Sequence, residues 1–516
     1  MSELRGNDAA AAGIALAGSG PFAVPVPRWT WPTDLPRPLV SALGFLALTL
    51  ALHLIQFGNP VLHVDEEFYL LVADHMRHGA LPFVDIWDRK PLGLFLLYRF
   101  FLLFPGDGVV TYQLFGVAAC AATALVIERL AREIASPAAA RLAGAVYILF
   151  LPVFCFGIGQ APVFYNLPVA LAALRTLEAW RARDARDFVR GGAQAMALLG
   201  LAIQIKYTVV FEGAAFGVVL LARACALGWN AGRLAGVALL WCAVAIAPTL
   251  AFLALYAAIG HGEAFIHANF LSILNRRSDG MASWSRLGSE MLGLVPFWLA
   301  ILWADRRLAA REGHDPAALW FLRLWAIAAF AGFLAFGSWY DHYVTPVLVP
   351  LSVLAAPALA QVPGARWRCV LLLGFGAIAS VVVMTDSIRR HGTKAQAEHI
   401  TASIRSELHS GCAFVFDGEP AFYRMAGSCL PGRYAFPNHL NTWTEAKALD
   451  IDPNLEVARI MMTRPDVVVV AEWWPFYLPN WETRAIVGDF LARGYERYAS
   501  AKLGTHTFGL WRRRKG

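Results

Sequence analysis

The sequence predicts a polytopic α-helical membrane protein that ends in a small α/β domain. Hydrophobic residues make up 58% of the 516 positions and charged residues only 16%, whereas soluble domains carry about 25% charged residues. The apolar residues form continuous runs, and a helix needs roughly 20 such residues to cross a bilayer. Runs without alternation favour helices over the strands of a barrel. From about residue 387 the long runs end, and short strand-like and helical segments alternate.

Eleven helices are predicted to span the membrane. The first 37 residues are rich in Ala, Gly and Pro and are expected to form a disordered cytoplasmic tail. The loop 58–93 should contain a short amphipathic helix along the interface, at about 66–79, and 92–104 is short for a span and should be a second juxtamembrane helix. The predicted spans are 38–57, 109–130, 139–157, 163–180, 192–205, 208–223, 234–257, 288–304, 319–337, 343–361 and 368–386.

The arginines between the spans predict the orientation. Cytoplasmic loops carry an excess of Arg and Lys, and one alternate set of loops contains Arg129, Arg132, Arg141, Arg181, Arg183, Arg186, Arg190, Arg223, Arg233, Arg306, Arg307, Arg311, Arg366 and Arg368. The other set, 58–93, the joint near Lys206, 258–287 and 338–343, then faces outwards together with everything after 387. Because these loops account for the net charge of +7, no nucleic-acid partner is expected.

The segment 387–516 is predicted to be an α/β domain on the outer face. Its expected strands are 412–417, 466–472 and 508–514, and its expected helices lie near 452–463 and 482–493. The cysteines follow no CxxC or CxxH spacing, so a structural zinc site is not expected. Cys412 and Cys429 could form a disulfide in an oxidising compartment, but sequence alone leaves that open.

The polar residues that suggest chemistry all fall on the predicted outer side. The first outer loop opens with Asp65 and Glu66 and closes with Arg89 and Lys90. Charged groups beside a membrane are costly and usually persist for function. A carboxylate next to cations suits the transfer of a group from a phosphate leaving group to a hydroxyl. The carboxylate would take the hydroxyl proton, and the cations would stabilise the departing phosphate.

Four motifs resemble the GT-C glycosyltransferases, in particular the branch of protein O-mannosyltransferases, aminoarabinose transferases and lipopolysaccharide galacturonosyltransferases. Asp65-Glu66 followed by Tyr69 is similar to the DExxY at the start of that family's first periplasmic loop, and Lys90-Pro91 to the Lys-Pro that closes it. Lys206 resembles a lysine at the end of the fifth span. DHYVTPVLVPLSVLAA, 341–356, resembles a late span of the family. The resemblance covers roughly 40–390, so 38–386 is interpreted as the catalytic transmembrane domain.

The resemblance implies an activity and roles for individual residues. Such enzymes move a sugar from a polyprenyl-phosphate donor to a lipid A or core, glycan or protein acceptor, at the periplasmic face of the bacterial inner membrane. Asp65 would be the general base. Glu66 is grouped with it as a catalytic residue, but it could instead support the site from behind or interact with the dipole of the following helix. Contacts to the donor phosphate would come from Lys90, Arg89, Lys206, Arg276 and Arg277, and contacts to substrate from Asp88, Tyr69, His342 and Tyr343. No cofactor or metal is required by the resemblance, although the carboxylates leave room for a divalent metal.

The sequence departs from the family pattern at two positions and leaves alternatives open. Arg89 stands where the family usually has an acid, and Leu92 replaces the second proline of Lys-Pro-Pro. Asp65 could instead cap the following helix, and Lys90 could be an interfacial lysine. A transporter or lipid flippase would concentrate ionisable residues near the midplane in repeated halves. A non-catalytic assembly protein would keep its cellular function without Asp65.

Overall fold

The computed structural model describes residues 37–308, 316–335, 337–360, 364–472 and 478–515, and the structural statements below concern these residues. The predicted tail 1–37 lies outside them except for Arg37, which begins the first helix. Residues 41–516 form one compact unit, so the predicted boundary at 386/387 stays a prediction.

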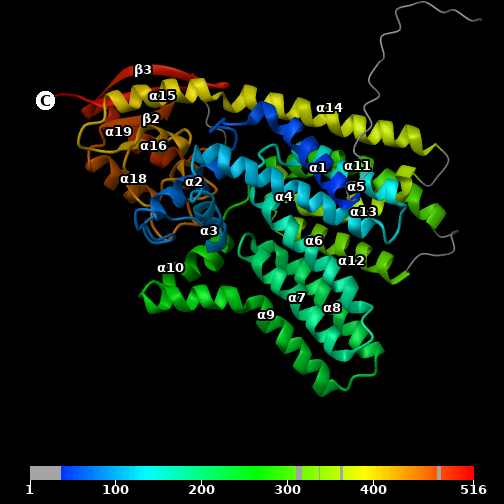
Figure 1. Cartoon of the computed structure of the whole chain (residues 1–516). Helices are drawn as coiled ribbons and strands as arrows, with labels where there is room; N and C mark the ends of the chain where they lie inside the picture. Colours follow the sequence, from blue (N-terminus) through cyan, green and yellow to red (C-terminus); the bar gives the residue numbers. More distant parts are fainter. Residues whose placement is uncertain (1–36, 309–315, 336, 361–363, 473–477, 516) are drawn as a thin grey trace, which may run out of the picture. The chain divides into compact units, whose positions relative to one another are not determined.

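The chain is mostly helical up to the end of the membrane part (Figure 1). Its helices are α1 (Arg37–His53), α2 (Val64–Met76), α3 (Leu92–Phe101), α4 (Gly108–Ala131), α5 (Pro137–Phe154), α6 (Ala161–Trp180), α7 (Ala185–Ile203), α8 (Val210–Ala226), α9 (Ala231–Ala258), α10 (Gly262–Ile266), α11 (Met281–Leu308), α12 (Pro316–Leu334), α13 (Thr345–Ala360) and α14 (Ala365–His391).

Among the described residues, eight segments are long and apolar enough to cross a membrane. They are Pro38–Gln56, Gly108–Ala131, Pro137–Phe154, Tyr207–Ala226, Ala231–Ala258, Met281–Ala304, Pro316–Leu334 and Ala365–Ser406. The other three predicted spans are also helices: α6, α7 and α13. The last of these is shorter than a usual span, so the number eleven stays a prediction. α7 and α8 are separate helices that meet at Lys206, as predicted.

The membrane helices pack around α5. It contacts α4, α13 and α14, while α6 packs against α4 and α7, and α12 packs against α8 and α13. Their facing sides are closed by apolar side chains such as Ile127, Val146 and Leu351, none of which is exposed to solvent. Many outward-facing apolar residues of α9 and α14, such as Leu239 and Ile378, are exposed. This pattern of an apolar exterior around a packed interior is what a lipid-embedded bundle requires.

The first outer loop is more deeply buried than predicted. Its helix α2 has eight consecutive buried residues, 66–73, so it does not lie along the interface with one face in solvent. The reason is the C-terminal domain, which covers it: α16 contacts α2, and the ring of Phe68 meets that of Phe436 at 5.1 Å between centroids.

The C-terminal part is a four-stranded mixed sheet with helices, as predicted in kind. The strands β1 (Ala413–Val415), β2 (Val467–Ala471), β3 (Tyr495–Leu503) and β4 (His506–Arg513) lie in the order β1-β2-β4-β3, with β1 parallel to β2 and the other pairs antiparallel. The helices are α15 (Lys394–Ser406), α16 (Ala421–Ala426), α17 (Pro437–Asn441), α18 (Pro453–Met462) and α19 (Trp481–Gly494). Figure 1 shows α15 in yellow and the later elements of this part in orange to red.

Two features of this domain add to the sequence analysis. β3 was not predicted, because its alternation is irregular and its pairing with β4 shifts register between Arg497 and Ala499. Cys412 and Cys429 form a disulfide, with their Cα atoms 5.0 Å apart. The bond joins the residue before β1 to the segment after α16.

Candidate active site

A polar cavity of about 660 Å³ brings together most of the predicted site residues. Its walls come from the first outer loop, from the ends of membrane helices and from the C-terminal domain. Of the predicted residues it contains Asp65, Asp88, Arg89, Lys90, Arg276, His342 and Tyr343. Segments more than 250 residues apart in the sequence therefore converge on one space, which is the arrangement expected of an active site.

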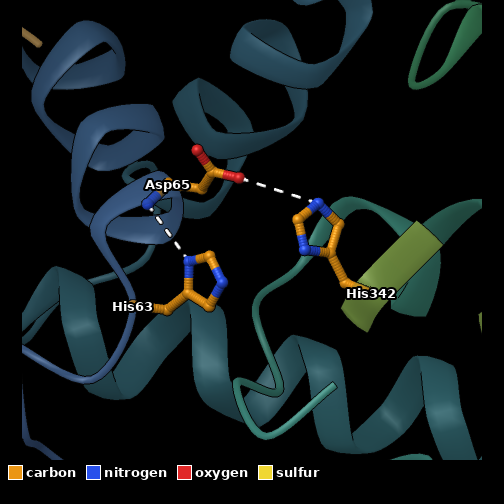
Figure 2. A group of neighbouring side chains, drawn as sticks. All are labelled: His63, Asp65 and His342. Atoms are coloured by element: carbon orange, nitrogen blue, oxygen red, sulfur yellow. Dashed lines mark hydrogen bonds and ion pairs between the residues drawn. The ribbon is translucent and has the colours of Figure 1, made fainter. Parts of the chain in front are cut away.

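The Asp65 carboxylate is free to face this cavity because another residue caps its helix. The N-cap of α2 is His63, whose Nδ1 accepts the backbone N–H of Asp65 at 3.2 Å. One carboxylate oxygen of Asp65 lies 3.4 Å from Lys90 Nζ, and the other lies 3.9 Å from His342 Nε2 (Figure 2). Burial raises the pKa of Asp65, but the nearby charge of Lys90 is the main cause that outweighs it and holds the pKa below its ordinary value. Asp65 is therefore ionised.

Lys90 is held in place by Tyr69, the tyrosine of the DExxY motif. Its ammonium donates to the Tyr69 hydroxyl at 3.0 Å and lies 5.1 Å from the centre of that ring. Residues four apart share one face of a helix, which explains why Asp65 and Tyr69 both reach Lys90. Burial lowers the pKa of Lys90, but Asp65 and Asp88 raise it above its ordinary value. Tyr69 itself is buried behind the lysine and does not line the cavity.

Glu66 lies apart from the other predicted catalytic residue. Adjacent helix positions do not share a face, and Glu66 points into the core, where its Oε1 accepts the backbone N–H of Gly159 at 3.0 Å. A Cβ on Gly157 would come within 2.0 Å of the same oxygen, so glycine makes room for the carboxyl. Burial raises the pKa of Glu66 to about 8. Glu66 is therefore mainly a neutral acid at pH 7 and does not line the cavity.

Arg89 and Arg276 meet at a residue that the sequence analysis did not single out. Glu445 of the C-terminal domain forms ion pairs with both. Arg277 is not part of this group: its backbone N–H bonds to Thr444 and its guanidinium lies 4.3 Å from the ring centre of Trp443. Glu445 follows no motif, and only the folded domain carries it to the cavity.

Asp88 also faces a partner from the C-terminal domain. Its Oδ1 accepts the backbone N–H of Arg89 at 2.6 Å and lies 4.0 Å from His439 Nε2. Burial raises the pKa of Asp88 despite the nearby charges of Lys90 and Arg89. Burial and the charge of Arg89 lower the pKa of His439 to about 3, so this histidine is neutral. His439 is a second cavity residue that the sequence analysis missed.

A second cavity, of about 630 Å³, is lined mainly by apolar side chains and contains Lys206. The lysine ammonium lies 4.3 Å from the ring centre of Tyr343. Arg89, Lys90, Ile273 and Tyr343 line both cavities. The polar and the apolar cavity therefore meet at the two cations that close the first outer loop.

His63, Asp65 and His342 could hold a divalent cation. Each offers a ligand atom, and these atoms lie within 4.8 Å of one another; Figure 2 shows the three side chains converging. Zinc bound at about 2.1 Å from tetrahedral ligands separates them by roughly 3.4 Å, so a modest contraction would be needed. His342 Nδ1 also lies 3.3 Å from Asp341 Oδ1, an outer carboxylate of the kind that orients metal-bound histidines. The Lys90 ammonium contacts one carboxylate oxygen of Asp65, which leaves the other oxygen for a metal.

Solved structures share this fold at low sequence identity. ArnT from Cupriavidus metallidurans in the apo state matches 91% of this chain and 98% of its own, with a TM-score of 0.57 and 16% identity. The same protein bound to undecaprenyl phosphate matches 92% and 97%, with a TM-score of 0.54 and 16% identity. The chain has the GT-C fold.

A more distant structure agrees. The archaeal oligosaccharyltransferase AglB from Archaeoglobus fulgidus, in complex with an inhibitory peptide and a dolichol-phosphate, matches 92% of this chain and 74% of its own, with a TM-score of 0.50 and 14% identity. No protein-family model matches the sequence, and no curated protein matches it. The predicted GT-C fold with a C-terminal α/β domain is thus confirmed, and the multi-pass membrane helices agree with it.

Proposed function

We propose that this protein is a membrane glycosyltransferase that moves a sugar from a polyprenyl-phosphate donor to a hydroxyl of an acceptor. One observation carries the proposal: an ionised aspartate and a lysine, 3.4 Å apart, stand where a polar and an apolar cavity meet. Such a junction suits a substrate with a long apolar tail, a phosphate and a sugar. The GT-C fold shared with ArnT bound to undecaprenyl phosphate supports it.

The apolar cavity suits the isoprenoid part of the donor. Its walls include Ile203, Ile246, Leu250, Leu253 and Phe270. Of these, Leu250 and Phe270 are 56% and 40% exposed, so this part of the cavity wall is accessible. A carrier could therefore enter from the bilayer, and its burial against these side chains would stabilise the complex.

The cations at the end of the apolar cavity suit the donor phosphate. Lys206 lines that cavity and Lys90 lines both. In the reaction, the bond between the sugar and the carrier phosphate breaks and its electron pair stays on the phosphate oxygen. Fixed ammonium groups that stabilise this developing charge are a major source of catalysis in transfer reactions.

Asp65 would act on the acceptor. The acceptor oxygen forms the new bond to the anomeric carbon while its proton passes to the Asp65 carboxylate. Attack opposite the departing phosphate would invert the anomeric centre. Lys90 also controls this step: when the donor phosphate attracts its ammonium, Asp65 loses its main counter-charge, so its pKa rises and it becomes a stronger base.

The wider setting follows from the sequence. The arginine distribution supports a cavity on the outer side, which for a bacterial inner membrane would be the periplasm. Acceptors available there include lipid A and core sugars, other envelope glycans and proteins. The sugar is left to experiment.

The proposal is tested by expressing the protein in cells that lack it and reading envelope glycolipids and glycoproteins by mass spectrometry. We expect a sugar-sized mass that depends on the wild-type protein and disappears with Asp65→Asn at equal protein level. Asp74→Asn is the matched control, because Asp74 lies on the same helix, pairs with the exposed Arg77 and does not line the cavity. A product that survives Asp65→Asn would exclude Asp65 as the base and favour a non-catalytic role.

A further inference from the structure

Glu445 bridges two arginines that come from different outer loops. Its Oε1 lies 2.6 Å from Arg276 Nε, and its Oε2 pairs with Arg89. The glutamate side chain is only 8% exposed, and all three residues line the polar cavity. Burial raises the pKa of Glu445, but the two arginines outweigh it and hold the pKa below its ordinary value. A carboxylate thus sits between two guanidinium groups, as a bound phosphate or carboxylate would.

The two arginines are held in place independently of this carboxylate. Arg276 also donates to the Tyr340 hydroxyl at 2.9 Å and to Ser338. The guanidinium of Arg89 lies 5.5 Å from the ring centre of Trp87. Both arginines therefore have contacts besides their shared partner, which favours a preformed binding site.

The arrangement leaves positive charge and one donor without a partner. Two guanidinium groups share one carboxylate, so the group carries a surplus of one positive charge. Within the described residues, the buried Nε–H of Arg89 has no acceptor. The neighbouring Asp88 Oδ1 accepts the backbone N–H of Arg89 instead. An external anion with more oxygens than a carboxylate could use this donor.

We propose that Arg89 and Arg276 form an anion-binding subsite for a phosphate or carboxylate group on the sugar or the acceptor, and that Glu445 occupies it as an internal counter-ion until substrate displaces it. Arg276 lines only the polar cavity and Lys206 the apolar one, while Arg89 lies where the two cavities meet. The assignment to a substrate group rests on the proposed function. The anion-binding property itself does not.

Release of Glu445 leaves the C-terminal domain attached. The backbone bonds from Arg277 to Thr444, at 3.1 Å, and from Trp87 to Arg433, at 2.8 Å, connect the same surfaces. The exchange is therefore local: one side chain turns away while the domain stays in place. Glu445 also supplies an acid next to Arg89. The family that the sequence resembles usually has an acid at the position of Arg89 itself.

Binding of inorganic phosphate to the full-length protein, at constant ionic strength, tests the subsite. Glu445→Gln removes the internal competitor, so phosphate should bind about tenfold more tightly than to wild type, as the gain of a charge-assisted contact implies. Acetate, titrated in parallel, reports the carboxylate arm. Glu445→Asp keeps the charge but shortens the side chain, and should show an intermediate gain. Adding Arg276→Gln to Glu445→Gln should abolish the gain, because it removes one of the two arginines of the subsite. Lys90 and Lys206 are unchanged in this variant, so a gain that depended on them would persist.

The matched control is Asp450→Asn, which removes a carboxylate of the same domain that pairs with Arg433 outside the cavity. It should bind phosphate like wild type. Equal phosphate and acetate affinities in wild type and Glu445→Gln, or a gain that persists after Arg276→Gln, would overturn the subsite. In a transfer assay, phosphate inhibition of Glu445→Gln that competes with the acceptor would place the anionic group on the acceptor, and competition with the donor would place it on the donor. The phosphate-binding experiment tests the subsite even if no sugar transfer is found, so the two proposals can fail separately.

Discussion

Asp65 and Glu66 are neighbours in the sequence but lie in different surroundings. Asp65 faces a polar cavity, lies 3.4 Å from Lys90 and is ionised. Glu66, one residue later, is 1% exposed, bonds to the backbone of Gly159 and has a pKa raised to about 8. The difference shows that the role of a carboxylate is decided by the face of the helix on which it stands, and by whether a cation lies within reach.

The largest effect is expected for Asp65→Asn. An amide of the same shape cannot take the acceptor proton, and loss of a general base costs about 10²- to 10⁴-fold in rate. Single-turnover transfer in membranes would measure this loss of rate. Asp74→Asn is the control, because Asp74 lies on the same helix and does not line the cavity.

Lys90→Ala should have the next largest effect, a loss of about 10²-fold in kcat from the missing phosphate contact. It should also change the pH profile. Without Lys90 the pKa of Asp65 rises, and since transfer needs the ionised carboxylate, the acid limb of the profile should move to higher pH. A profile that stays in place would show that Lys90 does not set the ionisation of Asp65.

Leu250→Trp should have a smaller effect and should separate the two cavities. A bulky ring in the apolar cavity should raise the KM for a long-chain donor about tenfold and leave a donor with a very short chain unaffected. Leu239→Trp is the control, because Leu239 is on the same helix, 72% exposed and outside the cavity. An equal KM for both variants would remove this cavity as the carrier site.

Glu66→Gln should have the smallest effect on transfer, within about twofold, and a clear effect on stability. Because folding raises the pKa of Glu66 from 4.5 to about 8, the folded state binds more protons than the unfolded state between these values. The free energy of unfolding of the wild type therefore falls as the pH rises through that range, by roughly 3 kcal/mol at pH 7. Glu66→Gln should be more stable than wild type at pH 7.5 and less dependent on pH. Thermal unfolding at pH 5 and pH 7.5 would measure it, and an unchanged pH dependence would contradict the neutral assignment.

The membrane fold was readable from the sequence because its causes are local. Apolar runs predicted the helices, and β-branched runs such as 467–470 predicted strands that the structure contains. β3 was missed because it is a hairpin edge whose burial alternates irregularly. The burial of α2 was also missed, since it depends on a domain that begins more than 300 residues later.

The site was predictable only in part, for a similar reason. Asp65, Lys90, Arg276 and His342 could be selected because charges next to apolar runs stand out. Grouping Glu66 with Asp65 ignored helical periodicity, which already placed them on different faces. Glu445 and His439 could not be found, because nothing in their local sequence marks them and only tertiary structure brings them to the cavity.

The role of Asp65 as the base is tested most directly by measuring sugar transfer by Asp65→Asn and Glu66→Gln side by side, at equal amounts of folded protein. We expect Asp65→Asn to lose nearly all transfer while Glu66→Gln keeps the wild-type rate. Equal losses in both variants, or transfer retained in Asp65→Asn, would contradict the assignment of the cavity-facing carboxylate as the base.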